Sequence, residues 1–125
     1  GRWQVLGVLY RADRVQRPLT RLPVRPIDRD DGWCDACADR NYNRPVRHPY
    51  AASAERLWRA DDLYDIIVVL NQNVQPRARG RGSAIFMHIA GPGYAPTEGC
   101  IALRREHLLW FVRRAGFGGA VHVLP

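Results

Sequence analysis

The chain has 125 residues, enough for one domain with a single hydrophobic core, and no stretch approaches the roughly 20 apolar residues of a transmembrane helix. All 19 basic residues are arginine, which excludes Schiff-base chemistry and a phosphate-binding loop that depends on lysine. The net charge of +7 predicts an anionic partner. The scattered arginines follow no helix-turn-helix, RRM or zinc-finger pattern, so we expect no nucleic-acid partner.

The first half of the chain contains one clear strand, a long irregular stretch and a short helix. Trp3–Tyr10 is rich in β-branched and aromatic residues and predicts a strand. Proline, Asp, Arg and Asn are frequent in Pro18–Tyr50, so we expect few regular elements there and an ordered loop packed on the domain. The segment "SAERLWRA" (53–60) predicts a short helix with Ser53 as its N-cap.

Two apolar strands and two polar loops are expected next. Tyr64–Leu70 is a continuous apolar run that predicts a strand buried on both faces. The segment "SAIFMHIA" (83–90) predicts a second apolar strand, which carries His88 near its end. The segments 71–82 and 91–99 are rich in polar residues, Gly and Pro, and predict loops.

The C-terminal segments predict a helix and a final strand. Residues 104–116 place apolar side chains at helical spacing, with Gly116 as the expected C-terminal cap, and residues 119–124 read as a strand. There is no internal repeat and no linker, so we expect residues 1–125 to form a single, mainly β domain with few and short helices.

Three cysteines, Cys34, Cys37 and Cys100, leave at least one thiol unpaired within a monomer. The Cys-x-x-Cys pair formed by Cys34 and Cys37 could be a short disulfide loop, a redox pair, two metal ligands or two separate thiols. Together with His88 the three cysteines would reach the four-ligand count of a structural zinc site, which is one alternative function for them.

A second hypothesis concerns His88 and Cys100, which flank a loop of eleven residues with two prolines and three glycines. Such a loop can fold back and bring both side chains together. An imidazole beside a thiol can take its proton and produce a nucleophilic thiolate, and backbone N–H groups around Gly99 could stabilise an oxyanion. The alternative is that Cys100 is a small buried hydrophobe at the start of a core strand, "CIAL".

The stretch "GSAIFMHIAGPGYAPTEGCIAL" resembles the catalytic core of the YkuD-type L,D-transpeptidase family. That family has a histidine on one strand, a loop, and then Ser/Thr-His-Gly-Cys followed two residues later by Arg or Asn. By this resemblance His88 is the general base, Thr97 matches the Ser/Thr, Gly99 matches the glycine and Cys100 is the nucleophile. The resemblance also implies that Ile89 orients the imidazole through its backbone carbonyl.

Two positions depart from the family pattern, since Glu98 replaces the usual second histidine and Ala102 replaces the usual Arg or Asn. In this the chain is similar to a divergent proteobacterial branch, which we associate with cross-links between L-alanine and diaminopimelate of neighbouring stem peptides. The resemblance covers Tyr64–Leu109 and extends to "DGWCD" and "YNRPV" upstream.

The resemblance implies a mainly β, YkuD-like sandwich, a periplasmic location and a reaction without metal, nucleotide or other cofactor. Cys100 would attack an amide of one peptidoglycan stem peptide and form a thioester. The diaminopimelate amine of a second stem would then close a cross-link. With water as acceptor, the same site would be an endopeptidase or carboxypeptidase.

The substrate contacts are predicted from the upstream segment and from the loop before the thiol. Trp33, Tyr42, Asn43 and Arg44 are our candidates for the wall of the cleft, where an arginine would grip stem carboxylates. Their alternative roles are core packing for the two aromatic residues and a solvated surface charge for the arginine. Glu98 is expected either to contact a substrate amine or to cap a turn. A non-catalytic module that binds the cell wall or nucleic acid through its basic surface remains the alternative for the whole chain.

Overall fold

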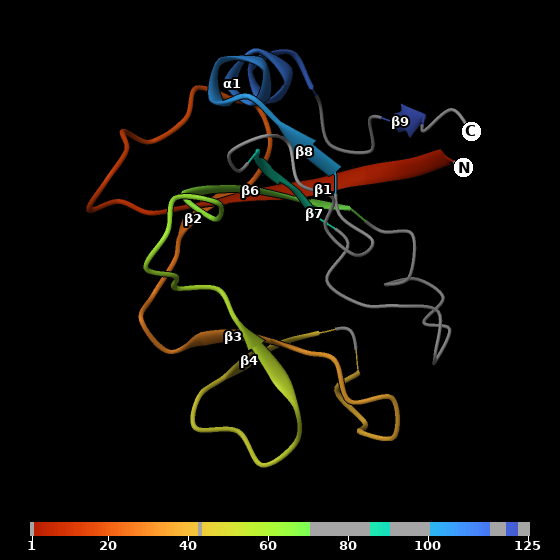
Figure 1. Cartoon of the computed structure of the whole chain (residues 1–125). Coiled ribbons are helices and arrows are strands. Elements are labelled where there is room, and N and C mark those ends of the chain that lie inside the picture. Colours follow the sequence, from red (N-terminus) through yellow and green to blue (C-terminus); the bar gives the residue numbers. More distant parts are fainter. Residues whose placement is uncertain (1, 43, 71–85, 91–100, 116–119, 123–125) are drawn as a thin grey trace.

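The computed structural model describes residues 2–42, 44–70, 86–90, 101–115 and 120–122, and Figure 1 shows them as two sheets and a helix. The elements in chain order are β1 (Arg2–Tyr10), β2 (Val24–Pro26), β3 (Asp31–Cys34), β4 (Pro45–Arg47), β5 (Ala54–Arg56), β6 (Ile66–Leu70), β7 (Phe86–Ile89), β8 (Ile101–Leu103), α1 (Arg105–Arg114) and β9 (Ala120–His122). The described chain is therefore mainly β, which confirms the predicted fold class. No helix within these ranges is long and apolar enough to span a bilayer.

The larger sheet has six strands in the order β2-β1-β6-β7-β8, with β9 also paired to β1. The long strand β1 pairs with β9 through its first residues, with β2 through its last residues, and with β6 from Val5 to Tyr10. β6 and β7 are antiparallel, whereas β7 and β8 are parallel. This order places the histidine strand β7 between the apolar strand β6 and the strand that follows Cys100.

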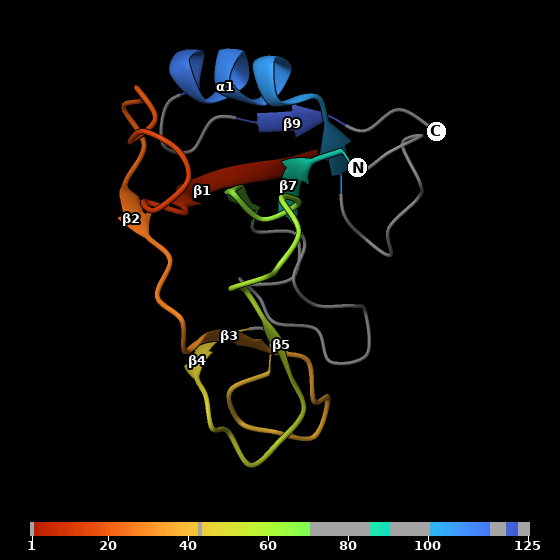
Figure 2. The same cartoon turned by 60° about the vertical axis from the view of Figure 1, so that its left-hand side comes forward.

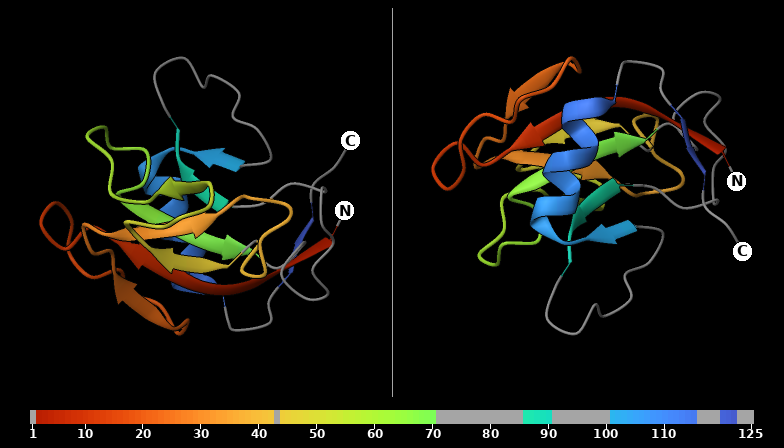
Figure 3. Two further views of the ribbon diagram at one scale, coloured as in Figure 1. Left: turned by 90° about the horizontal axis from the view of Figure 1, so that it is seen from below. Right: turned by 90° about the horizontal axis from the view of Figure 1, so that it is seen from above.

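Both faces of the larger sheet are covered, which explains why its central strand is apolar throughout. Figure 3 shows α1 crossing one face of this sheet, and Figure 2 shows the smaller sheet below the other face. All five residues of β6 are buried. Ile66, Val68 and Leu70 pack in the cluster that contains the buried residues of α1, while Ile67 and Val69 pack against the smaller sheet. Burial on both faces is the arrangement that a continuous apolar strand predicts.

The smaller sheet has the strand order β4-β3-β5 and depends on a glycine in its central strand. A Cβ atom on Gly32 would lie 2.5 Å from Nε2 of His48 and 3.1 Å from the carbonyl oxygen of Glu55. The ring of His48 therefore packs where any other residue would place its side chain, and only glycine leaves that space.

In the first half of the chain, the helix prediction is wrong and the prediction of a mostly irregular stretch is confirmed. The segment 53–60, for which the sequence predicts a helix, contains the strand β5, which pairs with β3, and Leu57 directly after this strand is buried in the core. Most of Pro18–Tyr50 is irregular, as expected, and the strands that it contains, β2, β3 and β4, are three or four residues long. In both cases the strands are short and form because a distant strand supplies the hydrogen bonds, so local propensity is overridden by tertiary pairing.

The other elements agree with the sequence within a few residues. β1, β6, β7, α1 and β9 lie inside the segments predicted for them or extend beyond them by a single residue. The loops expected at 71–82 and 91–99 and the cap expected at Gly116 lie outside the described residues.

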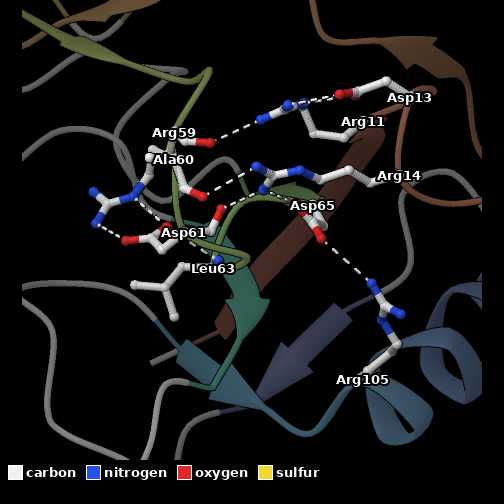
Figure 4. Close-up of polar contacts among 9 residues, drawn as sticks. All are labelled: Arg11, Asp13, Arg14, Arg59, Ala60, Asp61, Leu63, Asp65 and Arg105. Atoms are coloured by element: carbon white, nitrogen blue, oxygen red, sulfur yellow. Dashed lines mark hydrogen bonds and ion pairs between the residues drawn. The ribbon is translucent and has the colours of Figure 1, made fainter.

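Asp65 is a buried carboxylate that links the segments next to β1 and β6 to the start of α1. Its side chain is 4% exposed and forms ion pairs with Nη1 of Arg14 at 3.1 Å and with Nη2 of Arg105 at 3.4 Å. Its carbonyl oxygen accepts the backbone N–H of Arg11 at 2.9 Å. Figure 4 shows Arg14 and Arg105 converging on Asp65 from opposite sides. The three segments that meet here follow β1, precede β6 and begin α1, so this network fixes the helix on the sheet.

Candidate active site around His88

His88 is the third residue of β7 and is almost completely buried, with 1% of its surface exposed. Its Cα is paired with Ile67 of β6 and with Ala102 of β8. Because side chains alternate along a strand, His88 shares a face with Phe86, which packs toward the smaller sheet. The imidazole therefore lies in the layer between the two sheets.

The imidazole is held by the next residue of its own strand. Nδ1 of His88 lies 2.9 Å from the carbonyl oxygen of Ile89. A carbonyl oxygen only accepts hydrogen bonds, so Nδ1 carries the hydrogen and Nε2 is the basic nitrogen of the neutral ring. This tautomer is the one that a general base requires when its substrate proton arrives at Nε2.

Aromatic rings surround the imidazole on the inner face of the sheet. The ring of Tyr64 lies edge-on to His88, with centroids 5.5 Å apart and an interplanar angle of 69°. Tyr64 also contacts Phe86 at 5.9 Å, and Phe86 contacts Trp33 at 5.2 Å, both in edge-to-face geometry. These contacts restrict the tilt of the imidazole and exclude water from its sides.

A carboxylate completes this cluster. The hydroxyl of Tyr64 donates a hydrogen bond to Oε1 of Glu55, a residue of β5 in the smaller sheet. Burial raises the pKa of Glu55, whereas the hydrogen bond from the hydroxyl of Tyr64 and the positive charge of Arg59 act in the opposite direction. The guanidinium of Arg59 lies over the ring of Tyr64, 5.2 Å from its centroid. Ionisable side chains of β5 and of the segment between β5 and β6 thus gather around Tyr64, whose ring contacts His88.

Of the residues predicted for the cleft wall, the two aromatic ones are buried and the arginine is exposed. Trp33 and Tyr42 are 5% and 2% exposed, and Trp33 belongs to the core cluster between the sheets. Arg44 is exposed, and its carbonyl oxygen accepts the backbone N–H of Cys34 at 2.9 Å. The remaining candidates lie outside the described residues: Asn43, Thr97, Glu98, Gly99 and Cys100.

Cys34 and Cys37 do not form a disulfide. Cys34 is completely buried, and its Sγ donates a hydrogen bond to Oδ2 of Asp39 at 3.6 Å. Burial raises the pKa of the Cys34 thiol, which disfavours the thiolate that both nucleophilic attack and metal binding require. Cys37 is exposed. No group of three or more His, Cys, Asp or Glu in the described part of the chain is arranged to hold a metal ion.

The sequence interpretation did not identify Glu55 and Tyr64 as parts of the site. Tyr64 is the first residue of the apolar run that predicts β6. The one local sign of a role in the site is its hydroxyl group, which stands next to the acidic Asp65 at the start of this run. Glu55 lies in the segment expected to be a helix, so its position opposite Trp33 in the β3–β5 pair could not be anticipated.

Comparison with protein families gives a match over residues 1–123 to the YkuD family, described as the L,D-transpeptidase catalytic domain. Comparisons with curated proteins and with solved structures find no match. The matched range includes every described element of both sheets and the helix.

Proposed function

The chain belongs to the family of L,D-transpeptidase catalytic domains, and from this premise we propose that it cross-links peptidoglycan stem peptides through a thioester on Cys100. The family supports an L,D-transpeptidase-type activity with peptidoglycan as substrate. The nucleophile, the base and the type of linkage are our proposal, and the contact between His88 and Ile89 is the observation that carries it.

The topology supports the pairing of Cys100 with His88. β8 runs parallel to β7, with Ile101 paired to Met87 and Ala102 paired to His88. Cys100 is joined by its peptide bond to Ile101, the first residue of β8. The candidate nucleophile is thus covalently tied to the strand that lies beside the candidate base.

In the first half-reaction, Nε2 of His88 takes the proton of the Cys100 thiol as the sulfur attacks an amide carbonyl of the donor stem. The S–C bond forms and the carbonyl becomes an oxyanion, for which backbone N–H groups at Gly99 and Cys100 are the proposed donors. The amide C–N bond then breaks, and His88 returns the proton to the leaving amine. The hydrogen bond from Nδ1 to Ile89 keeps the ring in the required tautomer while its charge changes.

In the second half-reaction, the amine of diaminopimelate on another stem attacks the thioester. The new amide C–N bond forms, the C–S bond breaks, and His88 accepts the proton that the amine loses. We propose that Glu98 contacts this acceptor and that Asn43 and Arg44 contact stem carboxylates. The likeness to the divergent branch leads us to propose an L-alanine to diaminopimelate linkage, formed in the periplasm.

Purified protein incubated with muropeptides rich in diaminopimelate, beside a Cys100→Ala control, tests this proposal. Mass spectrometry with fragmentation should find a dimer that the control lacks, and the fragments should place the new bond between L-alanine and diaminopimelate. A dimer with another linkage would refute the proposed linkage alone. Shortened monomers without dimers would indicate hydrolysis, and the absence of any Cys100-dependent product would contradict the proposal.

A further inference from the structure

A groove of about 680 Å³ lies between α1 and the segment that follows β1. Figure 1 shows this segment beside the helix, on the side of the larger sheet that faces away from the smaller one. His88 points into the opposite layer, toward Tyr64 and the smaller sheet. The groove is therefore separated from the candidate active site by the sheet itself.

The groove is lined by five arginines and one carboxylate, Glu106. The arginines are Arg14, Arg17, Arg105, Arg113 and Arg114. Asp65 binds two of them, Arg14 and Arg105, and so holds them at the wall of the groove (Figure 4). Within the described ranges, no hydrogen bond or ion pair is seen for the guanidinium groups of Arg17 and Arg113. The groove thus carries a positive charge that the described residues do not neutralise.

Exposed apolar side chains also line this groove. Leu19 and Trp110 are 72% and 59% exposed, and they are the large hydrophobic side chains that the described part of the chain leaves exposed. Both line the groove. The guanidinium of Arg114 lies over the ring of Trp110 at 4.3 Å from its centroid, which orders the indole. An ordered tryptophan beside arginines without described partners is the composition that binding hot spots favour.

We propose that this groove binds a peptidoglycan strand at a second site, apart from the bonds that react. Arginines would pair with the carboxylates of stem peptides, and the face of Trp110 would pack on a sugar or an aliphatic stem residue. The choice of ligand rests on the peptidoglycan substrate of the proposed function. Such a site would hold the enzyme on its polymer while the cluster around His88 acts on a stem peptide.

The concave shape favours a polymer chain over a lipid surface. A groove of this volume is in the size range of ligand-binding sites, and a chain segment can fill it. A flat anionic bilayer would contact the rim of the groove and leave its floor, which includes Ile66 and Leu109, unoccupied. Charge complementarity with carboxylates and the recessed apolar floor therefore point to the same ligand.

The test is co-sedimentation of the full chain with purified, insoluble sacculi, using Cys100→Ala as the background so that the polymer is not altered. Trp110→Ala combined with Arg113→Gln changes the groove, and Arg29→Gln is the control for removal of an exposed arginine elsewhere. We expect the groove variant to lose about fivefold or more in affinity, because tryptophan and arginine dominate such contacts, and the control to stay within about twofold. Binding should also weaken as salt rises, since surface charges are screened.

Two further measurements separate this proposal from its rivals. With Cys100 intact, the groove variant should turn over small soluble muropeptides at the unchanged rate, because the groove lies across the sheet from His88. Equal sacculus binding by the groove variant and the control would overturn the proposal. Binding to phosphatidylglycerol vesicles that depends on Trp110 and Arg113, without such dependence for sacculi, would assign the groove to a membrane instead. If no form of the enzyme turns over muropeptides, the proposed reaction fails, while the sedimentation comparison still decides the groove.

Discussion

The ring of Tyr64 lies edge-on to the imidazole of His88, with ring centroids 5.5 Å apart, and its hydroxyl donates a hydrogen bond to Glu55. One side chain thus links the candidate base to a carboxylate of the other sheet. The ring and the hydroxyl perform separable tasks. The ring restricts the orientation of His88, and the hydroxyl solvates a carboxylate that is partly removed from water.

Substitution of Tyr64 should separate these tasks. Tyr64→Phe keeps the ring and removes the hydroxyl, so we expect it to lower the free energy of unfolding by about 1 kcal/mol, with a small effect on kcat. Tyr64→Leu also removes the ring and should lower kcat by about tenfold, because the imidazole is less restrained. Urea unfolding and steady-state muropeptide turnover measure the two effects. Full kcat in a folded Tyr64→Leu variant would show that the ring does not position His88.

Glu55 should make stability depend on pH. Burial raises its pKa in the folded state above its ordinary value of 4.5, so its contribution to stability is present below that value and is lost as pH rises through the folded-state pKa. Glu55→Gln removes this titration while keeping an oxygen that accepts from Tyr64. The stability of Glu55→Gln relative to wild type should therefore increase as pH rises above 4.5, and then level off. Urea unfolding at a series of pH values measures the difference, and a difference that is flat or decreases with pH would contradict the assignment.

Asp65→Asn should destabilise the fold through the arginine network. The change removes the charge that Arg14 and Arg105 share while preserving the shape of the side chain. Since Asp65 is buried and its partners are partly solvated, we expect a loss of about 2 kcal/mol in the free energy of unfolding. Asp61→Asn is the matched control, because the side chains of Asp61 and its partner Arg59 are 45% and 38% exposed and their ion pair should contribute less than about 1 kcal/mol. Equal losses for the two variants would refute the structural role of Asp65.

The Cys-x-x-Cys pair should be dispensable for the reaction. Cys34 is buried on Asp39 and its pKa is raised by burial, so iodoacetamide should modify Cys37 but leave Cys34 intact in the folded protein. We expect Cys34→Ser combined with Cys37→Ser to retain cross-linking activity. Peptide mapping and the muropeptide assay test both statements. Complete loss of activity in a folded double variant would show that the pair takes part in the reaction.

The sequence predicted the elements whose stability is local or whose pattern is continuous. The apolar run of β6, the histidine strand β7 and the amphipathic α1 are each identifiable from their own residues, because burial on one or both faces determines their composition. The contact of His88 with the carbonyl of Ile89 was implied by family resemblance and is formed within a single strand.

The smaller sheet could not be predicted in the same way. β3, β4 and β5 are three or four residues long, and each depends on hydrogen bonds to a partner distant in sequence. The local pattern around Glu55 therefore predicts a helix, and only the pairing of β5 with β3 brings this residue near His88. Local propensity carries little information where a strand is this short.

The central claim is that His88 activates the thiol of Cys100, and the rate of alkylation of that thiol tests it most directly. In a Cys34→Ser, Cys37→Ser background, iodoacetamide modification followed by intact mass spectrometry reports on Cys100 alone. We predict rapid reaction already below pH 7, and a rate at least about tenfold lower in a folded His88→Gln variant, because an unassisted thiol ionises only near pH 8.5. Equal rates in the two proteins, both rising only near pH 8.5, would contradict the claim.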